Sequence, residues 1–149
     1  MLFTFIPPAT EEHRVSFHAK LSSPASLSSG QILIPDHIIT NQGNAYNAAT
    51  GYFTATYNGT YVFLATTGPS QSSSYHADLD LMANNEVMSS IRTTYSYSGN
   101  YPTAKTGSCH AVVHLTSGQQ VWLKCHYRSH FDSQLTTFSG YLLSVDEEE

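Results

Sequence analysis

Two cysteine-histidine neighbours are the first residues in this sequence whose types suggest chemistry. Cys109 precedes His110 and Cys125 precedes His126, and a thiol beside an imidazole is a common pairing of a nucleophile with its base. Both pairs lie in runs that predict β-strands, where neighbouring side chains point to opposite faces and cannot bond to each other. The sequence also contains no G-x-S-x-G elbow, phosphate-binding loop or H-E-x-x-H motif. We therefore expect no enzymatic activity.

The eight histidines raise the separate question of a metal site. On the pairing of neighbouring strands that is predicted below, His110 and His126 are diagonal neighbours on one face, about 7 to 8 Å apart, where two ligands can share an ion. Lys124 would then lie opposite His110 and repel a cation. The sequence thus predicts no bound metal and no cofactor. A metal-binding matrix protein is kept as an alternative, and the histidines would equally make an assembly sensitive to mild acid.

Aromatic and polar residues gather in two segments predicted to be loops, 95–108 and 126–134. Sugars are bound by such mixtures, because flat rings stack on their C–H faces while amides and charged groups bond to hydroxyl or carboxylate groups. The alternative is that some of the tyrosines pack at an interface and that the charges are only solvated. The predicted ligand-binding residues are Tyr95, Tyr97, Asn100, Tyr101, Lys105, Arg128, His130 and Asp132.

Short runs of β-forming residues, separated by turn residues, are the elements that must position these groups. Low charge (11%) and abundant tyrosine and phenylalanine (10 and 7 residues) also favour strands over helices. The composition and the runs predict an all-β sandwich or barrel, with serine-rich loops at 21–30 and 68–74. The predicted strands lie at 14–20, 51–57, 60–66, 76–83, 86–95, 108–115, 119–127 and 137–145.

Turn residues predict two hairpins. Asn58-Gly59 lies between two β-forming runs and suits a two-residue type I′ turn, in which both residues have φ > 0. Gly118 is third in the loop of LTSGQ, where a type I turn with a G1 bulge needs a left-handed residue. The second hairpin places Cys109 opposite Cys125 on the inward face. Either a cross-strand disulfide or two buried free thiols would follow.

Several strands carry apolar residues on both faces. The run TYVFLA is apolar or aromatic on both sides, and the predicted second hairpin puts Trp122 and Val112 face to face away from the core. A strand with one solvated face would alternate apolar with polar residues. The second face therefore needs a cover, and a symmetric partner subunit is the expected one. The residues predicted to lie in this interface or in the core are Tyr61, Phe63, Trp122, Phe138 and Tyr141.

Charge and hydropathy exclude some classes of partner. The net charge is −5, with no basic patch of the kind that binds nucleic acid. No run approaches the roughly 20 apolar residues of a membrane-spanning helix. The apolar start ends at Pro7-Pro8 and has no basic flank, so no secretory signal is visible. Asn58-Gly59-Thr60 is a possible glycosylation acceptor, unless Asn58 serves only the turn.

Several motifs, in the right order, resemble the globular head of the complement C1q family. FTATYNGTYVF carries an aromatic residue and then a Gly-x-Tyr-x-Phe run, and it follows an Asn-x-Gly stretch in TNQGNAYNAATGYF. GQQVWLK and TTFSGYLLSV are similar to the family's Gly-x-x-Val-Trp-Leu strand and to its closing Phe-Ser-Gly-aromatic-Leu-Leu strand, and VSFHAKLS resembles its first strand. The resemblance predicts an N-terminal extension at 1–13, a C1q domain at 14–145 and an acidic tail at 146–149.

The resemblance implies a ten-stranded antiparallel jelly roll, similar to tumour necrosis factor and assembled as a homotrimer. Such domains are secreted and non-catalytic, and many stand-alone invertebrate members, abundant in molluscs, are lectin-like pattern-recognition proteins of innate immunity. We therefore expect a homotrimer that binds glycans or microbial surface polysaccharides. A cytokine-like or organiser-like ligand of a protein receptor is the alternative. Several relatives hold Ca²⁺ through aspartates before the VVHL strand, but 95–108 has no carboxylate and places Lys105 or a near neighbour there, so we expect no calcium.

Overall fold

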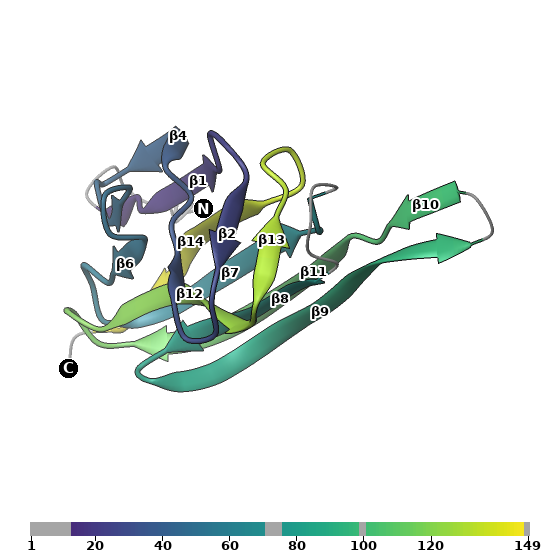
Figure 1. The fold of residues 1–149 in the computed structure, drawn as a ribbon. Helices are drawn as coiled ribbons and strands as arrows, with labels where there is room; N and C mark the ends of the chain where they lie inside the picture. Colours follow the sequence, from purple (N-terminus) through teal and green to yellow (C-terminus); the bar gives the residue numbers. More distant parts are fainter. Residues whose placement is uncertain (1–12, 71–75, 99–100, 148–149) are drawn as a thin grey trace, which may run out of the picture.

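Strands make up the regular structure of this protein in the computed structural model, which describes residues 13–70, 76–98 and 101–147 (Figure 1). Between 95 and 104 only the strands, and not their side chains, are described. The described ranges contain no helix that is long and apolar enough to cross a membrane. The strands are β1 (Ser16–Lys20), β2 (Ala25–Leu27), β3 (Ile32–Leu33), β4 (His37–Gln42), β5 (Tyr46–Asn47), β6 (Tyr52–Thr54), β7 (Gly59–Thr67), β8 (His76–Ala83), β9 (Glu86–Ser98), β10 (Tyr101–Ala104), β11 (Gly107–Leu115), β12 (Gln120–Tyr127), β13 (Ser129–Phe131) and β14 (Thr137–Val145).

Two antiparallel sheets form the body of the molecule. One has five strands in the order β11-β7-β14-β1-β4, and the other has seven, in the order β10-β9-β8-β12-β6-β5 with β3 beside β12. The short strands β2 and β13 pair with each other. In Figure 1, β9 and β10 extend beyond the rest of the molecule as an arm. This is the jelly roll that the resemblance implies, and the described residues divide it into fourteen strands instead of ten.

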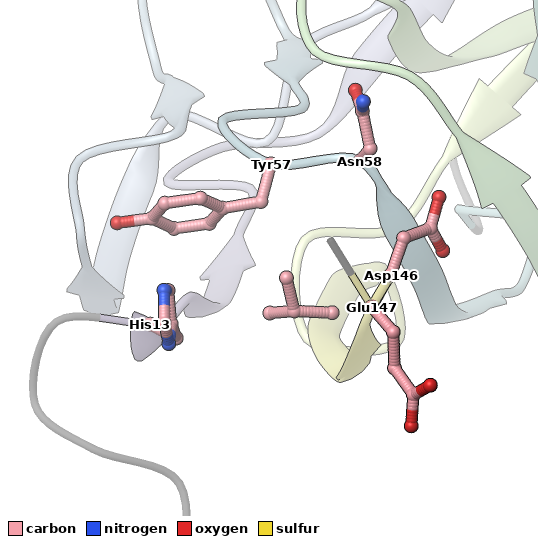
Figure 2. Close-up of a pocket in the computed structure, with 6 residues that line it drawn as sticks. His13, Tyr57, Asn58, Asp146 and Glu147 are labelled. Carbon is pink, nitrogen blue, oxygen red and sulfur yellow. The ribbon is translucent and has the colours of Figure 1, made fainter. Parts of the chain in front are cut away.

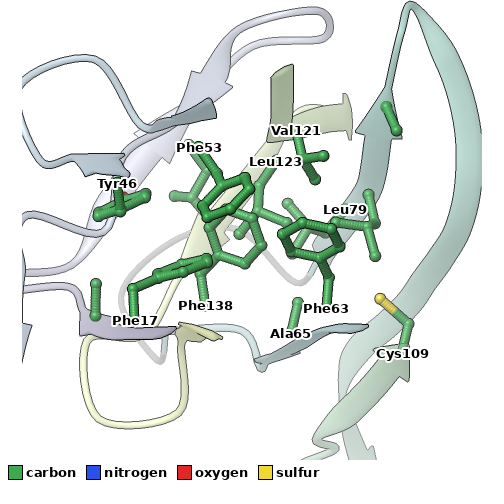
Figure 3. Packing of buried hydrophobic residues seen from close by; sticks show 14 of the residues in the cluster. Phe17, Tyr46, Phe53, Phe63, Ala65, Leu79, Cys109, Val121, Leu123 and Phe138 are labelled. Atoms are coloured by element: carbon green, nitrogen blue, oxygen red, sulfur yellow. The ribbon is translucent and has the colours of Figure 1, made fainter. Parts of the chain in front are cut away.

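The core lies between the two sheets and is rich in aromatic rings (Figure 3). Phe17 of β1 stacks on Tyr46 with 4.7 Å between ring centroids, and it meets Phe138 of β14 edge-on at 4.9 Å. Phe53 of the other sheet lies 5.1 Å from Phe63, so the rings join both layers. Packed aromatic pairs of this kind contribute beyond their buried area. The buried hydroxyl of Tyr46 donates a hydrogen bond to the Pro35 carbonyl at 2.7 Å, and burial raises the pKa of this tyrosine.

The predicted Asn58-Gly59 hairpin is wrong. The strands on either side, β6 and β7, belong to different sheets, and neither Asn58 nor Gly59 has a positive φ. Gly59 serves a different purpose, because a Cβ there would overlap the backbone carbonyl oxygen of Ser144 on the neighbouring strand β14. The glycine therefore permits a close approach of two backbones. The side chain of Asn58 instead accepts a hydrogen bond from the Ser117 backbone N–H at 2.8 Å.

A two-residue turn of the predicted kind occurs at a different place. Asn84 and Asn85 join β8 to β9 and have φ values of 53° and 65°, as a type I′ turn requires. Ala83 pairs with Glu86 across this turn. Asparagine tolerates the left-handed region better than most residues, which explains why no glycine is needed. The turn was not predicted, because Asn-Asn is a weaker signal than Asn-Gly.

The second predicted hairpin is also wrong, although its turn residue was chosen correctly. Gly118 has φ +95° and the Gln119 N–H donates to the Thr116 carbonyl, as in the expected turn. The chain then passes from one sheet to the other, so β11 pairs with β7 and β12 pairs with β8. The predicted alternation of inward-facing and outward-facing residues along each strand is nevertheless correct. The residues predicted to face inward are buried except Ala111, which is half-buried; the buried ones are Cys109, Val113, Val121, Leu123 and Cys125.

Strand positions were predicted better than strand partners. The ends of β8 and β14 agree with the predicted runs 76–83 and 137–145. The serine-rich segment 21–30 was predicted to be a loop but contains β2, which is hydrogen-bonded to β13. Of the other serine-rich segment, 68–74, residues 71–74 lie outside the described ranges. β2 has only three residues, none of them buried, and among the described strands it pairs only with β13, so its composition resembles that of a loop.

Candidate functional site

The first predicted binding segment, 95–108, is a pair of strands in place of a loop. β9 continues to Ser98 and forms a hairpin with β10. Lys105 follows this hairpin and is exposed, while its backbone carbonyl accepts a hydrogen bond from the Thr93 hydroxyl. The structure therefore places the lysine at the base of the arm. The predictions for Tyr95, Tyr97, Asn100 and Tyr101 fall on side chains outside the described residues.

Part of the second predicted segment forms a small polar hollow where β2 and β13 pair. Its volume is about 120 Å³, and Arg128 and His130 both line it. The imidazole of His130 is held by the Ser26 hydroxyl, with 2.6 Å between Oγ and Nδ1. Arg128 is exposed beside it. A guanidinium, an imidazole and a hydroxyl in one shallow hollow provide hydrogen bonds for sugar hydroxyls or for a carboxylate.

Asp132 does not take part in this hollow. Its carboxylate accepts hydrogen bonds from the backbone N–H groups of Gln134 at 2.8 Å and Leu135 at 3.2 Å. Its own N–H donates to the Gly68 carbonyl at 2.9 Å. A carboxylate bonded to the backbone two and three residues later is a turn-forming group. The structure therefore gives Asp132 a role in shaping the loop.

The predicted pairing of His110 with His126 is wrong. His110 lies on β11 in the five-stranded sheet, and His126 lies on β12 in the other sheet. The two histidines are therefore not neighbours on one face, and the predicted way for them to share an ion is excluded. Within the described ranges, no three histidine, cysteine, aspartate or glutamate side chains are grouped in a way that could hold a metal ion.

His126 instead belongs to a charged cluster on the outer face of the seven-stranded sheet. Asp80 of β8 has a side chain only 3% exposed, and its carboxylate lies 2.8 Å from the Arg92 guanidinium and 3.2 Å from His126 Nδ1. Ser90 also donates to it at 2.8 Å. The cluster draws on three adjacent strands, which a single strand's pattern does not reveal. The one available signal was the pair of aspartates in HADLDLMA, because acids are rare in a buried strand.

The pKa of Asp80 is lowered, even though burial by itself would raise it. The hydrogen bonds from Ser90 and Arg92, the charge of Arg92 and the hydrogen bond from His126 together outweigh the cost of removing the carboxylate from water. The carboxylate is therefore ionised at neutral pH and fully paired. This arrangement is typical of a structural ion pair, since nothing in it holds a group poised for proton transfer.

Both cysteines are buried free thiols, in agreement with the second of the two alternatives and not with a disulfide. They lie in opposite sheets and face the same core. Burial raises the pKa of Cys109 and of Cys125. A raised pKa leaves little thiolate at neutral pH, so neither residue is an activated nucleophile.

A larger hollow lies beside the C-terminal strand (Figure 2). Its volume is about 380 Å³, and its lining includes the edge-to-face pair His13 and Tyr57, whose centroids are 5.0 Å apart. Asp146 also lines it and forms an ion pair of 2.9 Å with His114. The possible glycosylation acceptor Asn58 forms part of the same wall. A glycan attached to Asn58 would therefore compete with any other ligand for this hollow.

The outer face of the five-stranded sheet is apolar across its neighbouring strands β11, β7 and β14. Leu64 of β7 is 43% exposed, Val112 of β11 is 63% exposed and Tyr141 of β14 is 42% exposed. Val62 pairs with Val112 on one side and with Tyr141 on the other, so these side chains form one patch. Tyr61, Phe63 and Phe138 are fully buried in the core, while Trp122 is half-buried on the other sheet. Of the five residues predicted for the interface or core, only Tyr141 lies on this apolar patch.

A sequence profile of the C1q domain matches residues 16–143 of this chain. The chain is 36% identical to Caprin-2 of Danio rerio over 144 residues, which are 89% of this chain and 14% of that protein. It is 33% identical to human complement C1q tumor necrosis factor-related protein 3 over 145 residues, which are 93% of this chain and 53% of that protein. The chain thus spans about half or less of these relatives.

Solved structures that share the fold include the following two. The globular domain of zebrafish complement 1qA protein superposes with a TM-score of 0.67 and 16% identity, covering 90% of this chain and 100% of that one. The Eiger TNF structure from S. frugiperda superposes with a TM-score of 0.68 and 10% identity, covering 91% of this chain and 96% of that one. At such low identities the similarity establishes the architecture.

Proposed function

This chain belongs to the C1q domain family, and from that membership we propose that it is a secreted pattern-recognition domain that binds carbohydrate on microbial or cell surfaces. C1q and tumour-necrosis-factor-like domains are non-enzymatic ligand modules of a secreted type. The main observation in favour of carbohydrate as the ligand is the hollow lined by Arg128 and His130, which is shallow and polar. Such a surface suits a ligand with many hydroxyl groups and does not enclose a reacting substrate.

Self-association through the apolar patch is the second part of the proposal. Leu64, Val112 and Tyr141 expose apolar surface on three neighbouring strands of the five-stranded sheet. Contiguous apolar patches on soluble proteins mark interaction sites, and domains of this family form trimers. We propose that copies of this chain cover the patch as a homotrimer.

Assembly would compensate for weak single sites. A shallow hollow of about 120 Å³ contacts little of a glycan, so each site binds weakly. Several sites held at fixed spacing bind a repetitive target much more tightly than one site does. A microbial polysaccharide is such a target, which is why the proposal assigns the protein to innate immune recognition.

A ligand of a protein receptor is the second candidate. It is favoured by the similarity to complement C1q tumor necrosis factor-related protein 3 and by the shared architecture with Eiger TNF. The arm of β9 and β10 offers strands that such a receptor would contact (Figure 1).

Pelleting with insoluble polysaccharides tests the proposal. The purified protein is mixed with yeast mannan particles, chitin or peptidoglycan, with and without EDTA, and the bound fraction is measured after centrifugation. We expect at least one of these to remove the protein from solution, EDTA to leave binding unchanged, and free oligosaccharide to reverse it. Failure to bind any polysaccharide or glycan, combined with capture of one receptor ectodomain, would favour the second candidate.

A further inference from the structure

A third hollow lies on the outer face of the seven-stranded sheet and shares no lining residue with the two hollows described above. Its volume is about 240 Å³. The six residues that line it include two aromatic rings and three amide side chains, and none of the six carries a charge. We propose that this hollow binds a neutral hexose or N-acetylhexosamine unit of a glycan. The lining residues are Tyr52, Asn84, Asn85, Gly118, Gln120 and Trp122.

The two aromatic rings form one side of the hollow. Tyr52 of β6 and Trp122 of β12 have centroids 5.1 Å apart and planes inclined by 55°. Both are half-buried and point away from the core, since the residue that follows each of them, Phe53 and Leu123, is fully buried on the opposite face. Trp122 also pairs across the sheet with the buried Met82. The indole is thus supported from two neighbouring strands, and a supported ring loses little entropy when a sugar stacks on it.

The amides form the other side. Asn84 and Asn85 occupy the type I′ turn between β8 and β9, and both are exposed. Among the described residues, neither of their side-chain amides has a hydrogen-bond partner. The backbone N–H of Asn84 donates to the Gln120 carbonyl at 3.4 Å, which holds the turn against β12. The Gln120 amide donates to the Thr54 hydroxyl at 3.2 Å, which orients its carbonyl oxygen as a further acceptor.

This combination selects a class of ligand. An amide supplies both a donor and an acceptor, so pairs of amides match the adjacent hydroxyl groups of a sugar ring. None of the six lining residues is a cation, so the hollow does not favour a ligand that carries a carboxylate or a sulfate. The hollow is also somewhat smaller than the roughly 300 Å³ of the smallest drug-sized pockets, which suits about one sugar unit. The hollow of Arg128 and His130 differs, because its charged side chain would favour an acidic sugar.

The position of the hollow fits an assembled protein. It lies on the seven-stranded sheet, and the apolar patch lies on the outer face of the five-stranded sheet on the other side of the core. Association through the patch would therefore leave the hollow open to a ligand. This inference rests on the proposed carbohydrate-binding function and names a place for it that the sequence did not indicate.

Trp122 makes the inference directly testable, because it is the only tryptophan in the chain. Its fluorescence therefore reports on this hollow alone. The protein is titrated with chitotriose, mannotriose and a galactose trisaccharide, with sialyllactose as the acidic comparison. We expect a saturable change in tryptophan emission with at least one neutral sugar, a weaker response to sialyllactose, and protection of the emission from acrylamide quenching by the bound sugar.

Variants then distinguish the contribution of the amide groups to binding from that of the turn conformation. Asn84→Gly with Asn85→Gly keeps both positive φ values available and removes both amides, so we expect affinity to fall by about 25-fold, at roughly fivefold for each of two lost hydrogen bonds. Asn44→Gly is the matched control, because Asn44 also has a positive φ, of 55°, and lies outside the hollow. It introduces the same backbone freedom and should leave affinity unchanged. Trp122→Phe keeps an apolar ring and allows binding to be measured by calorimetry.

The results distinguish an error in the assignment of this hollow from an error in the proposed function. Suppose that the chain pellets with a polysaccharide, but sugar does not change the tryptophan emission and the double variant binds as tightly as the wild type. The sugar then binds elsewhere, and the proposed function stands. Equal responses to sialyllactose and to the neutral sugars would overturn the assignment of ligand class. If the wild-type chain binds none of the polysaccharides or trisaccharides, both the hollow and the proposed function are wrong.

Discussion

Replacing Asp80 by asparagine should destabilise the protein at neutral pH, because the substitution removes a buried charge from its partners. The carboxylate is 3% exposed and has Arg92 at 2.8 Å, His126 at 3.2 Å and Ser90 at 2.8 Å. Breaking a fully buried ion pair costs about 3 to 5 kcal/mol. Arg92 and His126 are 42% and 52% exposed, so water compensates part of their loss. We therefore expect Asp80→Asn to cost about 2 kcal/mol, which is less than that range.

The pH dependence follows from the lowered pKa of Asp80. A carboxyl group whose pKa is lower in the folded state stabilises the fold above its ordinary pKa, here 3.8, and this stabilisation is lost as the pH falls through the folded-state value. Wild-type stability should therefore decline steeply below about pH 4 to 5. Asp80→Asn cannot lose this contribution. The two proteins should differ most near pH 7 and converge in acid.

Thermal unfolding at fixed protein concentration, repeated from pH 7 to pH 3, measures both effects. At neutral pH, we expect the thermal midpoint of the variant to be lower by about 4 to 8 °C, since 1 kcal/mol corresponds to about 2 to 4 °C for a domain of this size. Asp36→Asn is the control, because Asp36 is exposed and is bonded only to Ser22 among the described residues. Its effect should be clearly smaller. Equal midpoints for wild type and Asp80→Asn at pH 7 would refute the reasoning.

Three further predictions concern packing and assembly. Gly59→Ala should cost about 1 to 3 kcal/mol, because the new Cβ would overlap the Ser144 carbonyl oxygen, and thermal unfolding would show this. Val112→Asp should weaken self-association by about tenfold or more, as seen by light scattering on dilution, whereas Val87→Asp, 52% exposed on the other sheet, should not. If both substitutions have the same effect, the apolar patch is not the interface. Both cysteines should react with a thiol reagent only after unfolding, and a count below two thiols would contradict their free state.

The alternation of buried and exposed residues made the strands predictable, but not their partners. The inward positions of Val113, Val121 and Leu123 follow from a period of two, which holds whichever strand lies beside them. The turn at Gly118 has the expected conformation, yet it leads into the other sheet. A turn residue sets the local backbone angles. Whether the next strand pairs or crosses depends on which surface buries its apolar face, and one segment does not contain that information.

The candidate sites also divide into those that a local sequence pattern could predict and those that depend on strand pairing. Arg128 and His130 are near each other in the sequence and share a hollow, so a local pattern was enough to predict them together. The cluster around Asp80 and the hollow between Tyr52 and Trp122 each combine residues from several strands. Predicting them required the register of β12 with its neighbours. That register was predicted incorrectly, because β12 was paired with β11.

A glycan array printed at low and high density tests the central claim most directly, after light scattering has established the assembled mass. The account predicts binding to at least one sugar class, unchanged by EDTA, with a signal that rises more than in proportion to density because several subunits engage together. An array that stays blank at both densities, probed with an intact assembly, would contradict carbohydrate recognition.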